Sequence, residues 1–70
     1  MAEEKKEISY RSTKTSSTFT VSGTKDRAYL VVTGEASTNA KVMREVARIR
    51  TQGEVFKMVD FIARQYAATY

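Results

Sequence analysis

The segment AYLVVT, residues 28–33, limits the folds open to this chain more than any other stretch. Three of its six residues are β-branched and Tyr29 is aromatic, which predicts a β-strand that Gly34 closes. Side chains alternate between the two faces of a strand, and here both faces carry apolar groups. A strand of this kind needs cover on both faces, or a strand from a second chain beside it.

The residues before this strand are polar and leave two alternatives open. Residues 1–26 are rich in Ser, Thr, Lys and Glu, a composition typical of a flexible arm. The stretch STFTVSG alternates as a strand does, so an ordered edge strand over residues 18–22 is the other alternative. The turn-forming sequence SGTKD would join the two strands as a hairpin. We therefore divide the single domain into an arm or edge strand, 1–26, and a strand–helix–helix core, 27–70.

A helical period follows the strand. Residues 37–39, Ser-Thr-Asn, are all good N-caps, and apolar residues then recur on one side of the predicted helix. Lys41, Arg44 and Arg48 gather on the opposite side. The apolar side is assigned to the core. The basic side is either a solvated surface or a surface that contacts a phosphate backbone.

Residues 51–54, TQGE, interrupt the helical pattern. Thr51 and Glu54 fit a capping box, the signature of a helix start, and Gly53 inside a helix would cost about 1 kcal/mol relative to Ala. We therefore predict two helices separated near residues 50–52. A single long helix and a hairpin centred on TQGE are the alternatives.

The second predicted helix is apolar around most of its circumference, which indicates burial on most sides. One strand and one helix provide little cover, so we expect a symmetric partner; cover by N-terminal strands within a monomer is the alternative. The expected dimer interface consists of Leu30, Val32, Val55, Met58, Val59, Phe61, Ile62 and Tyr66.

The composition argues against catalysis. The chain has no Cys and no His, which excludes disulfides, thiolate metal sites and the usual neutral-pH acid–base residue. Its three glycines form no phosphate-loop or dinucleotide-binding pattern. We expect a protein that is not an enzyme and has no metal, cofactor or small-molecule substrate. Twelve basic and eight acidic residues give a net charge of +4, which favours a polyanionic partner.

The sequence also bears on location. Its longest apolar run, residues 28–32, is far shorter than the ~18 residues that a membrane span needs. The first ten residues, MAEEKKEISY, have no apolar core of the signal-peptide kind. We expect a cytoplasmic protein that does not bind membranes.

The order of strand, amphipathic helix, tight connection and second helix resembles the ribbon-helix-helix family of Arc-type and plasmid-partition repressors over residues 26–68. MREVA, residues 43–47, is similar to the apolar motif of that family's first helix, and TQGEVFK, residues 51–57, to the start of its second helix. The resemblance implies a homodimeric transcriptional repressor. Its paired strands would enter the major groove of DNA, and the N-termini of its second helices would hold phosphates.

Expected contacts follow from this resemblance and from the charge pattern. Arg27, Tyr29 and Thr33 would face the groove, while residues 51–53 would offer backbone N–H groups to a phosphate. The expected nucleic-acid-binding residues are Lys25, Arg27, Tyr29, Thr33, Lys41, Arg44, Arg48, Arg50, Thr51, Gln52 and Lys57.

Two other functions stay open. A small α+β protein-binding module, such as an inhibitor or assembly factor, would use its strand edge and its aromatic, Met-rich C-terminal helix. A subunit of a larger homomeric assembly is the third alternative. Residues 8–22 discriminate among these, because a disordered arm favours the DNA binder and paired strands favour the module or the assembly.

Overall fold

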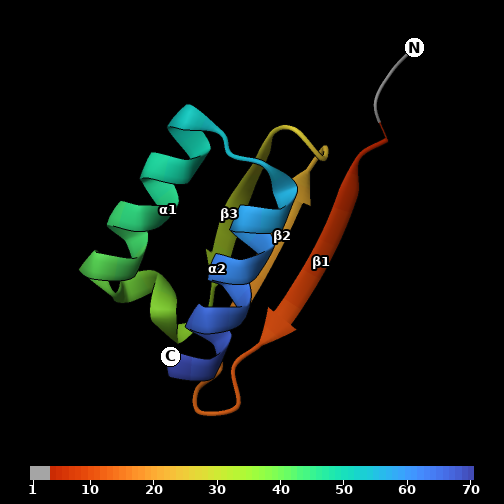
Figure 1. Ribbon diagram of the computed structural model, residues 1–70. Coiled ribbons are helices and arrows are strands. Elements are labelled where there is room, and N and C mark those ends of the chain that lie inside the picture. Colours follow the sequence, from red (N-terminus) through yellow and green to blue (C-terminus); the bar gives the residue numbers. More distant parts are fainter. Residues whose placement is uncertain (1–3) are drawn as a thin grey trace.

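The computed structural model describes residues 4–70 as a three-stranded antiparallel sheet followed by two helices (Figure 1). Residues 1–3, the first part of the expected arm, lie outside the described residues. The elements in chain order are β1 (Lys6–Arg11), β2 (Thr18–Gly23), β3 (Ala28–Thr33), the 3-10 helix η1 (Glu35–Thr38), α1 (Ala40–Gln52) and α2 (Phe56–Thr69). The expected α+β class, a hairpin followed by two helices, is confirmed.

The sheet has the order β1-β2-β3, with each strand antiparallel to the next. The predicted hairpin is present, and its turn is closed by the Thr24 N–H, which donates to the Arg27 carbonyl at 2.8 Å. The alternative of an ordered strand over residues 18–22 is confirmed by β2, but its expected edge position is wrong, because β1 pairs along the whole outer side of β2 and makes it the central strand. Residues 8–22 therefore contain two paired strands and not a disordered arm.

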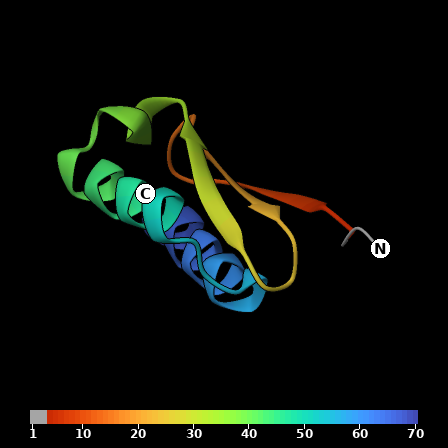
Figure 2. The same ribbon diagram turned by 90° about the horizontal axis from the view of Figure 1, so that it is seen from above.

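The two faces of the sheet differ in chemistry. Phe19, Val21 and Leu30 point to the helices and are fully buried. On the other face Thr20 lies between Ser9 and Val31, and its hydroxyl is 2.9 Å from that of Ser9. Both helices lie on the same side of the sheet (Figure 2), so this polar face has no helix over it.

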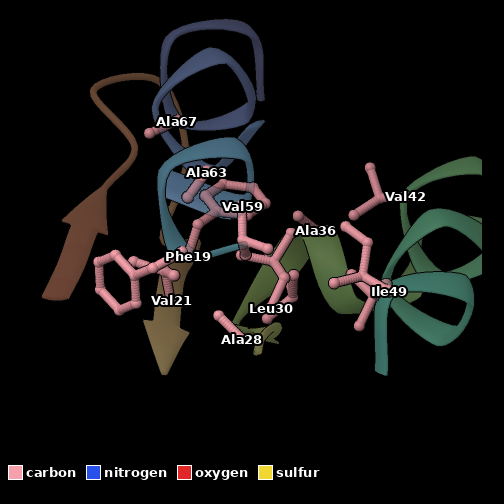
Figure 3. Packing of buried hydrophobic residues seen from close by; sticks show 13 residues of the cluster. Phe19, Val21, Ala28, Leu30, Ala36, Val42, Ile49, Val59, Ala63 and Ala67 are labelled. Atoms are coloured by element: carbon pink, nitrogen blue, oxygen red, sulfur yellow. The ribbon is translucent and has the colours of Figure 1, made fainter. Parts of the chain in front are cut away.

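The core has two parts that meet over β3 (Figure 3). Val59 and Ala63 of α2 pack over β2, and the small Ala side chain lets the helix approach the strand closely. Val42 and Ile49 of α1 pack against β3. The complete set of buried apolar residues is Phe19, Val21, Ala28, Leu30, Val32, Ala36, Val42, Val46, Ile49, Phe56, Val59, Ala63 and Ala67.

The helix ends confirm one cap and correct another. The Asn39 side chain accepts hydrogen bonds from the N–H groups of Lys41 and Val42, so it is the N-cap of α1. The expected capping box of the second helix is wrong, since α1 runs to Gln52 and Thr51 lies inside it, donating its hydroxyl to the Ala47 carbonyl. Gly53 ends α1 with φ of 71°, a conformation that favours Gly.

The break between the helices therefore falls at residues 53–55, slightly later than predicted, and the single-helix and hairpin alternatives are excluded. Residue 54 explains why the chain leaves the helix. Glu54 forms an isolated antiparallel bridge with Ala28, with N···O distances of 2.6 and 3.2 Å. This pairing lies on the side of β3 opposite to β2, so β3 has neighbours within its own chain on both sides at this point.

Candidate functional site

Two connections far apart in the sequence meet at one end of the molecule. The β2–β3 turn, residues 24–27, lies against the α1–α2 connection, residues 53–55, at the top of Figure 1. The Phe56 N–H donates to the Lys25 carbonyl at 3.0 Å, beside the Ala28–Glu54 bridge. Backbone hydrogen bonds thus hold the two connections together.

Basic side chains from four segments gather at this end. We name it the basic end and define it by Lys6, Lys25, Arg27, Arg50 and Lys57. All five side chains are exposed. Sequence reasoning had placed four of them in the expected contact set and had left Lys6 in the arm.

Arg27 joins the two connections through its side chain. Its Nη2 donates to the Gln52 carbonyl at 3.2 Å, and its guanidinium lies against the backbone of Gly53. A Cβ at residue 53 would lie 3.1 Å from this guanidinium, so the missing side chain of Gly53 makes room for it. The guanidinium covers the last turn of α1, where the negative end of the helix dipole favours a cation.

Two further cations lie over aromatic rings. The Arg50 guanidinium is 5.8 Å from the centroid of the Tyr29 ring, and the Lys6 ammonium is 5.8 Å from that of Phe56. Both distances are within the range of cation–π attraction. The alternation of Ile8 and Tyr10 in KEISYR was the available signal that Lys6 belongs to a strand.

The expected phosphate contact through backbone N–H groups of residues 51–53 is not supported. These residues end α1 instead of beginning α2, and the Gly53 N–H donates to the Ile49 carbonyl at 2.7 Å. At the true start of α2, the N–H groups of Phe56, Met58 and Val59 also have backbone acceptors. Most backbone N–H groups around the start of α2 are therefore already bonded within the chain, and the exposed basic side chains are the main groups that this end offers to an anion.

The expected basic stripe of α1 does not act as one unit. Arg48 forms ion pairs with Glu45 at 2.6 Å and Glu54 at 3.0 Å, which raise its pKa further and offset its charge. Lys41 lies in the first turn of α1, at the end of the molecule away from the basic end, and Arg44 is exposed between the two ends. Thr33 also lies away from the basic end, because β3 begins there and Thr33 is its last residue.

The expected dimer interface splits into three groups. Leu30, Val32 and Val59 are covered by the chain's own elements, so they leave the interface. Ile62 and Tyr66 are half-buried against the core. The exposed members are Val55, Met58 and Phe61 on α2, of which Met58 and Phe61 are 54% and 58% exposed.

A side-chain cluster fastens β1 to α2. The Tyr10 hydroxyl donates to an Asp60 carboxylate oxygen, and the other oxygen of Asp60 is 3.4 Å from Arg64. The hydrogen bond to Asp60 is the main reason why the pKa of Tyr10 is raised, and desolvation adds to it. Asp60 thus forms an ion pair with Arg64, one turn further along α2, and no Lys57–Asp60 ion pair is present among residues 4–70. The unpaired Lys57 contributes to the basic end.

The opposite end of the molecule holds a network of short polar side chains. The buried Ser17 hydroxyl accepts from the Ala36 N–H at 2.8 Å and lies 2.8 Å from the Thr15 hydroxyl, which donates to the Tyr70 carbonyl at 2.5 Å. A pocket of about 220 Å³ lies beside this network. These hydroxyls fasten the β1–β2 loop to η1 and to the C-terminus of α2.

Residues 4–70 contain no group of three or more Asp or Glu side chains placed to hold a metal ion. Over the same residues, neither helix has the length and apolar content that crossing a bilayer requires. The sequence matches no protein-family model, and no similar curated protein or solved structure was found.

Proposed function

We propose that this chain is a small α+β module that binds nucleic acid without catalysis, using its basic end to contact phosphates. One observation carries the proposal: two turns and the start of β1 bring cations from four segments to one end of the molecule. Exposed cations neutralise phosphates and release counterions, and this term supplies most of the affinity of sequence-independent binding.

The acidic residues near this end do not cancel its positive charge. Glu54 is paired with Arg48, so its charge is largely offset. Asp26 is exposed in the β2–β3 turn between Lys25 and Arg27, so the two cations of this turn outnumber its one carboxylate. A phosphate backbone therefore meets a local positive potential.

The paired strands at residues 6–23 are the outcome that favours a protein-binding module or an assembly over a DNA binder with a flexible arm, so nucleic-acid binding is proposed from the basic end alone. In a ribbon-helix-helix dimer the strand before the two helices pairs with its copy, whereas here two further strands, β1 and β2, precede β3 and form one sheet with it. The proposed contact is accordingly with the backbone, through side chains, and base-specific recognition is not part of it.

Salt dependence tests this proposal. Binding of a labelled random-sequence duplex is measured by fluorescence anisotropy across a salt series, with the double variant Lys25→Ala/Lys57→Ala. The control, Lys14→Ala/Lys41→Ala, removes the same charge at the opposite end. Removing two phosphate contacts should make the slope of log K against log salt less negative by about 1.8, because each contact on duplex DNA contributes about −0.9 to it.

The control is expected to keep a slope closer to that of the unaltered protein. Equal losses in the two double variants would mean that net charge alone drives binding. No binding at low salt would exclude the proposed function.

Protein binding is a second candidate function, favoured by the exposed apolar side chains of α2. Val55, which precedes α2, and Met58 and Phe61 of α2 are 42%, 54% and 58% exposed. A second copy of the chain on these side chains would form the homodimer expected from the sequence. Light scattering on the unaltered protein and on Met58→Ser/Phe61→Ser tests it, since a dimer would dissociate in the variant and a monomer would keep its mass.

A further inference from the structure

The basic end contains an open pocket between the first strand and the start of α2. It has a volume of about 470 Å³ and is lined by Lys6, Lys25, Asp26, Val55, Phe56 and Lys57. This volume lies within the range of about 300–1,000 Å³ that small-molecule sites occupy. Its lining combines three ammonium groups and one carboxylate, that of Asp26, with two apolar side chains.

The walls of the pocket are fixed by backbone contacts. The Phe56 N–H bonds the Lys25 carbonyl, and the adjacent Glu54 pairs with Ala28, so the turn and the helix start are held against each other. The pocket therefore exists in the folded chain before any ligand binds.

Val55 supplies most of the accessible apolar surface of the lining, because Phe56 belongs to the buried core and is only 9% exposed. Val55 is 42% exposed although it precedes a buried helix turn, and the Phe56 ring has the Lys6 ammonium 5.8 Å from its centroid. None of the three lysines is in an ion pair among the described residues. A ligand that fits this lining has an apolar, flat part for Val55 and Phe56 and an anionic part for the lysines.

We infer that this pocket takes one nucleotide of an unpaired nucleic-acid strand. The base would lie against Val55 and Phe56, and its flanking phosphates would contact Lys6, Lys25 and Lys57. The inference rests on the proposed function and adds to it a preference for single strands over duplexes. In a duplex the base is stacked and paired, so it is unavailable to the pocket, whereas single strands present it at little cost.

The test compares a 12-nucleotide single strand with its duplex by fluorescence anisotropy at one moderate salt concentration. Val55→Ala removes apolar surface from the pocket at an exposed position, which preserves the fold. Met58→Ala is the matched control, because Met58 is an exposed apolar residue of α2 outside the pocket. The expected result is a loss of about threefold to fivefold in affinity for the single strand with Val55→Ala. Duplex affinity, and both affinities of the control, are expected to stay within about twofold.

A chemical-shift titration with tetrathymidylate supplies the second readout. Amide shifts of Lys25, Val55 and Lys57 on addition of this probe support the inference. Equal effects of Val55→Ala on single strand and duplex, or shifts at Lys25 and Lys57 without a shift at Val55, overturn it while leaving phosphate binding at the basic end intact.

Polyglutamate and phosphatidylserine vesicles serve as competing probes, representing acidic peptides and anionic membrane surfaces. Either one binding more tightly than the oligonucleotide, with the same dependence on Val55, would overturn the inference in favour of that ligand. Failure of both nucleic acids to bind at low salt would remove the proposed function itself.

Discussion

At one end of the molecule Ser17, Thr15 and Asn39 satisfy backbone groups of neighbouring segments, whereas at the other end Lys6, Lys25 and Lys57 stay exposed. Both ends consist of turns and helix termini, and both carry a pocket. The difference lies in the side chains, because short hydroxyl and amide groups can reach nearby backbone atoms, while lysines extend into solvent. The polar residues of the first end stabilise the fold, and those of the basic end are free to bind a ligand.

Loss of the Ser17 hydroxyl is the largest expected effect on stability. Ser17→Ala leaves the buried Ala36 N–H without its acceptor, which lowers the free energy of unfolding by about 1–3 kcal/mol. Urea denaturation followed by circular dichroism measures it, with the exposed neighbour Ser16→Ala as control. Oligonucleotide affinity at a temperature where the variant is folded should not change; a parallel loss of binding would contradict the separation of the two ends.

A smaller effect is expected at the contact between β1 and α2, midway between the ends. Tyr10→Phe removes the hydrogen bond to Asp60 and lowers the free energy of unfolding by about 1 kcal/mol at pH 7. The folded-state pKa of Tyr10 is raised above its ordinary value near 10, so the stabilisation is complete below about pH 10 and is lost as pH rises through the folded pKa.

Urea denaturation of both proteins between pH 7 and pH 11 measures this dependence. The difference between them should shrink above pH 10. Since the pKa of Tyr66 is also raised, mainly by burial, the difference between the two proteins, and not either curve alone, reports on Tyr10. A difference that is constant across this range would contradict the assigned hydrogen bond.

The smallest effect is expected for Arg48, which lies near the basic end but is paired with two carboxylates. Arg48→Ala should lower duplex affinity by only about twofold to threefold, because it removes no proposed phosphate contact but leaves the Glu54 carboxylate unpaired near the basic end. Lys57→Ala in the same anisotropy assay should reduce affinity more. The reverse order would show that the ion pairs open when nucleic acid binds.

Local patterns in the sequence predicted β3, both helices, the hairpin turn and the Asn39 cap, since each depends on residues close together in the chain. The start of α2 was misplaced because Thr51 and Glu54 fit a helix start while Gly53 fits a helix end. The pairing of Glu54 with Ala28, a long-range contact, decides between them. Likewise, β1 was open to two interpretations because a polar strand and a polar arm have similar compositions.

The sequence predicted most residues of the basic end, but not that these residues lie together in the fold. Lys25, Arg27, Arg50 and Lys57 were expected to contact phosphates, yet the sequence gives no distance between the turn at 24–27 and the connection at 53–55. Lys6 was missed because its place at the basic end depends on the register of β1 with β2, in which it lies opposite Gly23.

A chemical-shift titration of the isotope-labelled protein with duplex DNA at low salt tests most directly whether the basic end contacts phosphates and the opposite end does not. The account predicts that amides of Lys6, Lys25, Arg27 and Lys57 shift and that those of Thr15, Ser17 and Ala36 do not, with the shifts disappearing as salt is raised. Shifts confined to the opposite end, or no shifts at low salt, would contradict it.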